Sequence, residues 1–239
     1  MILRRLTLHF REQNWFAVVL DLLIVVLGVF LGFQVTLWQG ALAEREREGM
    51  LLERLGEDLL ALQQVNERVA GQRDAMNAQF DRTIEFIRDP GSLEASPEAW
   101  REMISPVLGY PDPVTEFAIY DEIKSTAGFS LLSDDELRHE LSGFGQWLDN
   151  SKLALGVSGD SYGSAWERIY RHLVTAQEFP DLVAAMSLEQ RATLMADVQM
   201  MRTLAFFASS KAADIGLRAG ELIALLPEAA QPHQPAEPD

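Results

Sequence analysis

Residues 15–38 read WFAVVLDLLIVVLGVFLGFQVTLW, a stretch of 24 residues with one acidic side chain and no Lys, Arg, His, Pro or Glu. An α-helix rises ~1.5 Å per residue, so this stretch reaches ~36 Å, enough to cross a ~30 Å hydrocarbon core. No second run of eighteen apolar residues occurs in the chain. The sequence therefore predicts one transmembrane helix, over residues 15–38, with the lipid bilayer around it.

The flanks of this stretch bear on its orientation. Three arginines lie within about twenty residues on each side, so an excess of positive charge does not mark either flank as cytoplasmic. The amino-terminal tail, residues 1–14, is short, whereas long domains cross membranes largely regardless of their charge. We therefore expect a cytoplasmic tail and an extracytoplasmic carboxyl-terminal domain.

A cleaved signal peptide is the competing interpretation of the same stretch. Ala41-Leu42-Ala43, directly before Glu44, has the small-x-small form of a cleavage site. The apolar stretch is longer than the roughly 7 to 15 residues of a signal-peptide core, and it contains Asp21 and Gln34. These two features favour a helix that is retained in the membrane.

The predicted transmembrane helix has one small and polar face. At ~100° per residue, six positions fall within a sector of about 80°. These positions are Asp21, Val25, Gly28, Gly32, Thr36 and Gln39. The Gly28-x-x-x-Gly32 spacing allows a second backbone to approach closely, and an acid in hydrocarbon is costly unless it faces protein, water or a headgroup. We expect this face to bind a helix, of another integral membrane protein or of a second copy. The alternative is that Gly is simply common in membrane helices and that Asp21 reaches the headgroups.

Charge is distributed unevenly along the chain. The formal net charge is −16, and residues 1–40 contribute +1, so the remainder carries −17. Such an acidic domain is not expected to bind nucleic acid or anionic lipid. The chain contains no cysteine, which excludes disulfides and thiolate metal sites.

Two motifs also carry a resemblance. Asp21 is followed by a Leu-rich run to Gly28, and Gln34 stands four residues before Trp38. A second segment reads IKSTAG at 123–128 and continues as LLSDDEL at 131–137. Over residues 10–150 the chain resembles a family of uncharacterised bacterial single-pass membrane proteins. The resemblance implies an amino-terminal anchor and an extracytoplasmic helical domain, which in a bacterium means an anchor in the inner membrane and a periplasmic domain. It implies no activity.

Beyond the membrane the sequence predicts an all-α fold, a bundle of long antiparallel helices. No proline occurs over residues 41–88, and apolar residues recur there at spacings of three and four, which predicts one long amphipathic helix. Asn66 interrupts the apolar stripe, where it could fix the register of packing, although a partly exposed Asn is the commoner case. Because further apolar residues widen the stripe, we favour a bundle over a two-stranded coiled coil.

The remainder of the bundle is expected over residues 96–226. A short helix is predicted to begin at Ser96-Pro97, and another is predicted to run from Pro113 to Ala127. Ser133-x-x-Glu136 has the form of a capping box. Glycines predict a kink or turn near 156–159, followed by a helix over 161–176.

The last helix has the most regular pattern. Ser187-x-x-Gln190 predicts a capping box at its start. Ten apolar residues follow at alternating spacings of four and three: Leu194, Val198, Met201, Ala205, Ala208, Ala212, Ile215, Ala219, Leu222 and Leu226. We expect this stripe to lie in the core, with a neighbouring helix close to its alanines. The Pro-rich, acidic segment 227–239 is predicted to be disordered.

Two motifs match enzyme patterns in spacing only. Gly159-Asp160-Ser161-Tyr162-Gly163 fits the nucleophile elbow, with His172 downstream, but an elbow needs a strand-turn-helix setting that the sequence does not predict. Glu136-x-x-His139 is half of a di-metal motif, which requires a second copy and two further glutamates. We therefore expect no catalytic residue, no metal ligand and no cofactor.

Two classes of function remain after these motifs are set aside. The first is a non-catalytic interaction protein, an accessory or scaffold subunit of a larger inner-membrane complex such as a respiratory, photosynthetic or transport complex. The second is an extracytoplasmic sensor of a small molecule. A sensor of this kind would have to signal laterally through its transmembrane helix, because only fourteen residues precede that helix.

Overall fold

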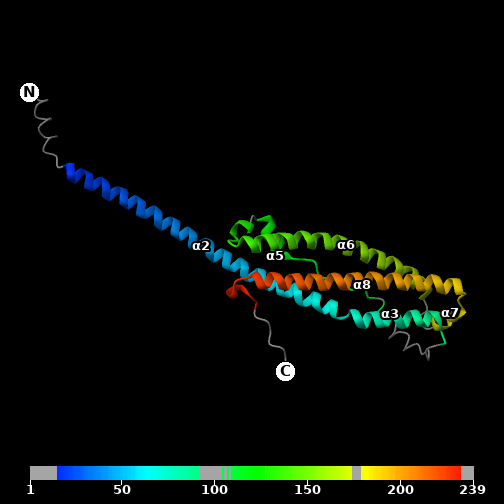
Figure 1. Cartoon of the computed structure of the whole chain (residues 1–239). Coiled ribbons are helices and arrows are strands. Elements are labelled where there is room, and N and C mark those ends of the chain that lie inside the picture. Colours follow the sequence, from blue (N-terminus) through cyan, green and yellow to red (C-terminus); the bar gives the residue numbers. More distant parts are fainter. Residues whose placement is uncertain are drawn as a thin grey trace, which may run out of the picture. The chain divides into compact units, whose positions relative to one another are not determined.

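The computed structural model describes residues 15–91, 104, 107, 109–126, 128–173 and 179–232. The described residues form helices joined by turns and one extended connection, with no β-strand among them (Figure 1). The predicted all-α fold is therefore confirmed. The chain divides into two compact units, residues 1–50 and residues 51–239. The predicted tail over 1–14 and the start of a helix at Ser96-Pro97 fall outside the described residues.

Helix α2 (Trp15–Gly71) contains the apolar stretch and continues beyond it. The segment predicted as one helix over 41–88 is divided in two, because α2 ends at Gly71 and α3 (Arg73–Arg88) follows. Gln72 between them keeps right-handed helical angles (φ −79°, ψ −9°), so the division is a local irregularity rather than a turn. Gly71, the poorest helix former after proline, stands where the hydrogen-bond ladder is interrupted.

Helices α6 (Asp135–Leu173) and α8 (Leu188–Leu225) pack against each other along their length. The Arg168 guanidinium near the end of α6 bonds to Asp197 near the start of α8. Trp147, which precedes Arg168 by about half the length of α6, lies instead beside Arg218 near the end of α8. The two helices are therefore antiparallel, as the sequence predicted.

Helices α2 and α3 cover another side of α8. Arg202 of α8 pairs with Asp81 of α3, and Gly220 of α8 lies against Gln63 of α2. These contacts make α8 antiparallel to the α2–α3 pair as well. Helix α8 is thus the central helix of the second unit, which is visible in Figure 1 as the long helix flanked by α6 and α3.

The hydrophobic core has two clusters along α8. One gathers buried side chains of α2, of the short helix α5 (Ala118–Ser125), of the first half of α6 and of the end of α8. Among them are Leu55, Leu59, Ile123, Leu141 and Ile215. The other gathers side chains of α3, the second half of α6 and the start of α8, among them Phe80, Ile87, Tyr162, Leu194 and Met201. The core therefore extends along the bundle instead of forming a single centre.

The predicted pattern of the last helix is confirmed. Ser187 accepts a hydrogen bond from the Gln190 backbone, and the Gln190 side chain accepts one from the Ser187 backbone, which completes the capping box. All ten residues of the predicted stripe are buried. Because Ala208 and Ala212 expose none of their surface, the neighbouring helices approach α8 closely at these positions, as expected.

The connection between α3 and α6 is less helical than predicted. Residues 111–117 are not helical, and only Ala118–Ser125 forms a helix, α5, where Pro113–Ala127 was expected. Pro111, Pro113 and Phe117 are buried while Asp112 and Glu116 are exposed, which is the two-residue alternation of an extended chain. The two prolines disfavour helix in the residues before them, and alternate burial holds the extended form.

Helix α6 is continuous where a kink was predicted. Its residues remain helical through 156–159 and on to Leu173, so the prediction of a turn at these glycines was wrong. At least one glycine of this helix serves packing instead of flexibility. A Cβ built on Gly145 would overlap three carbons of the Tyr120 ring, so only glycine allows α5 to lie this close to α6.

The ends of α6 and of the chain also differ from expectation. Asp134 Oδ1 accepts hydrogen bonds from the Glu136 and Leu137 backbones, so Asp134, one residue after the predicted Ser133, caps α6. Within the segment predicted to be disordered, Glu228–Ala230 forms the 3-10 helix η3, and Ala230 is buried. Residues 233–239 of that segment lie outside the described part.

Candidate functional site

The apolar part of α2 is long enough and apolar enough to cross a membrane. It is the one such helix among the residues that the structure describes. None of its apolar window is buried inside the protein, and large side chains such as Val29 (70% exposed) and Phe33 (61%) project from it. A soluble protein rarely exposes so large a continuous apolar surface. The candidate functional site is therefore this helix and the face predicted on it.

Gly28 and Gly32 have open space beside them. A Cβ built on either glycine would meet no atom of the chain within 4 Å. Gly56 and Gly145, in contrast, face close neighbours, while Gly143 and several others are open like the two glycines of the apolar helix. The two glycines of the apolar helix are thus not explained by packing within this chain, and a second helix could approach their backbones closely.

Thr36, one turn beyond Gly32 on the same face, bonds within its own helix. Its Oγ1 donates a hydrogen bond to the Gly32 carbonyl at 3.0 Å. This bond gives the hydroxyl proton an acceptor within the helix, an arrangement that serine and threonine commonly adopt in apolar surroundings. The face can therefore enter hydrocarbon or meet another helix at Thr36 without an unsatisfied donor.

The remaining predicted residues lie on the same helix. Val25 is 61% exposed, and Gln39 is exposed near the end of the apolar stretch. Asp21 is part of the helical backbone, and its side chain lies outside the described part. All six predicted positions thus belong to α2, but what binds to their face stays a prediction.

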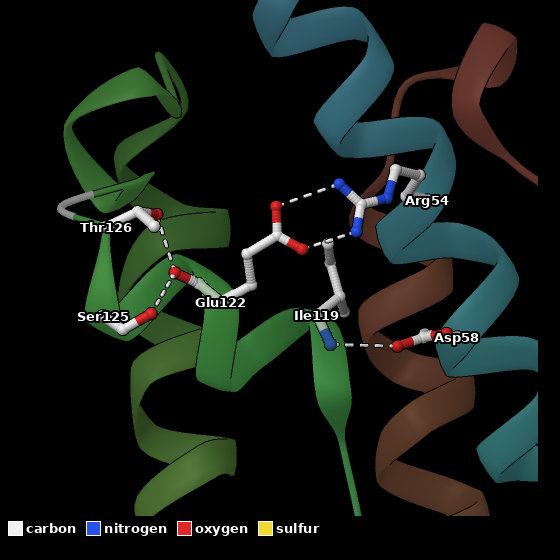
Figure 2. Close-up of polar contacts among 6 residues, drawn as sticks. All are labelled: Arg54, Asp58, Ile119, Glu122, Ser125 and Thr126. Carbon is white, nitrogen blue, oxygen red and sulfur yellow. Dashed lines mark hydrogen bonds and ion pairs between the residues drawn. The ribbon is translucent and has the colours of Figure 1, made fainter.

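A polar clasp joins α2 to α5 in the second unit (Figure 2). The Arg54 guanidinium donates two hydrogen bonds to the Glu122 carboxylate, at 3.0 and 2.5 Å. The hydrogen bond and charge of Glu122 raise the pKa of Arg54, and the hydrogen bond from Arg54 lowers the pKa of Glu122. Both side chains are about half exposed, so this pair contributes modestly to stability while it fixes the place of α5.

Asp58 of α2, one turn after Arg54, caps the amino-terminal end of α5. Phe117 precedes α5 and offers no side-chain cap, but Asp58 Oδ2 accepts a hydrogen bond from the Ile119 backbone at 3.0 Å (Figure 2). A carboxylate at this end also interacts favourably with the helix dipole. Sequence reasoning missed this cap because 61 residues separate donor and acceptor.

Asn66 is fully buried, contrary to the partly exposed position considered commoner. Its Nδ2 donates to the carbonyls of Leu62 and Val114, each at 2.9 Å. The bond to Val114 holds the extended connection against α2, which supports the alternative that Asn66 fixes packing. Its Oδ1 has no hydrogen-bond partner among the described residues.

Two tyrosines hold the same connection against α6. Tyr162 donates hydrogen bonds to the carbonyls of Val107 and Gly109, and its ring lies 5.1 Å from that of Tyr110. Burial raises the pKa of both phenols, so each stays protonated and available as a donor at neutral pH. These groups have a structural role that their sequence did not signal.

The structure places the enzyme-like motifs on helix α6. Ser161 lies inside α6 and donates to the Val157 carbonyl at 2.9 Å, far from the strained turn that an elbow requires. Among the described residues, no group of three His, Asp or Glu side chains is placed to hold a metal ion. His139 stands in α6 on its exposed side, and the His172 side chain lies outside the described part.

Comparisons with protein-family models, with curated proteins and with solved structures returned no match to this chain.

Proposed function

We propose that this protein is a non-catalytic, membrane-anchored interaction protein, an accessory or scaffold subunit of a larger inner-membrane complex. In this proposal α2 crosses the bilayer once, the amino terminus is cytoplasmic, and the helical bundle is periplasmic. The resemblance to bacterial single-pass membrane proteins is part of the same proposal. The complex would be of the respiratory, photosynthetic or transport class.

One observation carries the proposal. Residues 22–42 of α2 are apolar for the most part and exposed, and Gly28 and Gly32 among them have open space beside them. A bilayer accounts for the apolar surface, and a second helix accounts for the glycines on one stripe. The regular bundle, with its long apolar stripe on α8, supplies a helical body that such an anchor would hold near the complex.

Copurification tests the docking face. Gly28→Ile combined with Gly32→Ile fills the space beside both glycines, so we expect loss of the membrane partner that copurifies with the tagged wild type in mild detergent. Leu23→Phe is the matched control, because it adds bulk on the opposite side of the same helix. Retention of a stoichiometric partner by the double-isoleucine variant, or absence of any partner from the wild type, would contradict the proposal.

The orientation needs a separate experiment. Alkaline phosphatase fused to the carboxyl terminus is expected to be active, and a fluorescent protein that matures only in the cytosol is expected to be dark. The reverse pair of results would place the bundle in the cytoplasm. A mature chain that begins at Glu44 would show instead that the apolar stretch is a cleaved signal peptide.

A small-molecule sensor is the second candidate. It is favoured by the continuity of α2, which runs from Trp15 to Gly71 as one helix and so includes both apolar residues and core residues such as Leu55 and Leu59. A thermal shift produced by one metabolite, in a protein that copurifies with no membrane partner, would support sensing over scaffolding.

A further inference from the structure

A level of the bundle with little buried apolar surface separates the two core clusters. We call the part around the cluster of Leu59 and Ile123 the α5 lobe, and the part around the cluster of Phe80 and Tyr162 the α3 lobe. Seven residues of the long helices are buried between the lobes and belong to neither cluster: Asn66, Ser151, Leu155, Ser158, Ala208, Ser209 and Ala212. Four of these seven are polar and two are alanine, so burial of apolar surface stabilises this level less than it stabilises the lobes. We call this level the polar layer.

The interruption between α2 and α3 lies at the polar layer. Arg73 of α3 lies over the Phe206 ring of α8, with its Cζ 5.8 Å from the ring centroid. A Cβ built on Gly216 of α8 would lie 3.2 Å from the Cγ of Glu67 of α2. The part of α8 between these two contacts therefore faces the end of α2. The interruption is thus close to the level of Ser209, where the helical hydrogen-bond ladder of the α2–α3 pair is broken.

Two glycines of α6 lie at the same level. The two contacts that make α6 and α8 antiparallel also set their register, and midway between them residues 156–159 of α6 are level with residues 206–209 of α8. Gly156 and Gly159 fall in this range, and glycine is a poor helix former. The connection at 111–116, which passes from the α3 lobe to the α5 lobe, is not helical. Three of the segments that cross the polar layer therefore have a weak point there.

Two buried polar atoms of the layer have no hydrogen-bond partner among the described residues. They are the Oδ1 of Asn66, which is 0% exposed, and the Oγ of Ser209, which is 1% exposed. A buried polar atom without a partner destabilises the closed arrangement, because it has lost its hydrogen bonds to water. Opening of the layer would return both atoms to water.

We propose that the polar layer is a hinge at which the α3 lobe bends relative to the α5 lobe. In hinge motions a few residues absorb the change in backbone angles while the packed parts on either side move as units. Each lobe has its own hydrophobic cluster, so each stays packed while the layer opens. The hinge is independent of the face on α2 that contains Gly28 and Gly32, and it does not depend on what that face binds.

Distances between pairs of spin labels test the hinge in the full chain in detergent micelles. The chain contains no cysteine, so labels attach only at introduced cysteines. One pair spans the layer, one lies within the α5 lobe and one lies within the α3 lobe. In that order they are Glu57→Cys with Glu85→Cys, Glu57→Cys with Gln146→Cys, and Glu85→Cys with Glu167→Cys, all at exposed positions. We expect the distance distribution across the layer to be wider than either distribution within a lobe.

Alanine at two glycines of the layer should stiffen the hinge. A Cβ built on Gly71 or on Gly156 would meet no atom within 4 Å, so Gly71→Ala combined with Gly156→Ala favours helix without a clash. The double variant should narrow the distribution across the layer. It should also slow amide hydrogen exchange over residues 154–160 about fivefold, the ratio that the helix propensities of alanine and glycine predict.

Gly143→Ala is the matched control for this double variant. Gly143 is open in the same way, but it lies in the part of α6 that belongs to the α5 lobe. It should leave the width of the distribution across the layer unchanged. Equal widths across the layer and within the lobes of the wild type would overturn the proposal, and so would a double-alanine variant with an unchanged width and unchanged exchange.

Discussion

Gly145→Ala is the most direct test of the packing between α5 and α6. The added methyl group would overlap the Tyr120 ring, which is 5% exposed and packs against Phe117 and Phe129 at ring distances of 5.9 and 6.0 Å. The ring has no free direction in which to move, so the substitution should act as overpacking. Overpacking of a buried site costs about 1–3 kcal/mol, while alanine in place of glycine within a helix returns about 1 kcal/mol.

Gly143→Ala provides the matched control on the same helix. Gly143 is exposed, and a Cβ there would meet nothing within 4 Å, so only the gain in helix propensity remains. It should stabilise the protein by about 0.4–1 kcal/mol. The two alanine variants are thus expected to differ in unfolding free energy by about 1–3 kcal/mol, the overpacking cost that only Gly145→Ala incurs.

Urea unfolding followed by circular dichroism measures this difference. Gly145→Ala should be harmless in a Tyr120→Leu background, because the ring that the new methyl group would overlap has been removed. A double-mutant cycle should therefore show a smaller loss of unfolding free energy from Gly145→Ala in that background than in the wild type. Equal stability of Gly145→Ala and Gly143→Ala would refute the close approach of α5 to α6.

Three further predictions follow from other contacts. Ala208→Phe places a large side chain at a position that exposes no surface, so it should lower the unfolding free energy by at least about 1–3 kcal/mol, which thermal melting would detect as a lower midpoint. The carboxyl of Glu122 has a folded-state pKa below its ordinary value of about 4.3, so its bond with Arg54 stabilises the fold above that pH and is lost as pH falls through the lowered pKa. Glu122→Gln should therefore be less stable than the wild type at pH 6, and the difference should shrink as the pH falls below about 4.3. A difference that does not shrink on acidification would contradict the assignment. Gly56→Ala would bring its Cβ to 2.5 Å from the Ala230 carbonyl oxygen, so it should displace η3 and speed proteolysis after residue 226.

The sequence alone determined the elements whose signals are local or periodic. The apolar stretch over 15–38 is a matter of composition, and the capping box at Ser187 needs only two residues three positions apart. The stripe on α8 repeats over ten positions, so its burial followed from the helical period without knowledge of the neighbours. The absence of β-strands from the described residues followed in the same way.

Only the tertiary structure decided the features that depend on distant residues. The glycines of α6 predict a turn, because Gly weakens an isolated helix. In the structure α6 is continuous and packs against α8 along its length. Asp58 caps a helix 61 residues away, and Asn66 holds a carbonyl 48 residues away. The Trp147 ring contacts the cationic side chains of Lys211 and Arg218 on another helix. Such contacts form when the chain folds and leave no periodic or local trace. This is why the apolar helix and the buried stripe of α8 could be predicted, while the Arg54–Glu122 ion pair and the contacts of Trp147 could not.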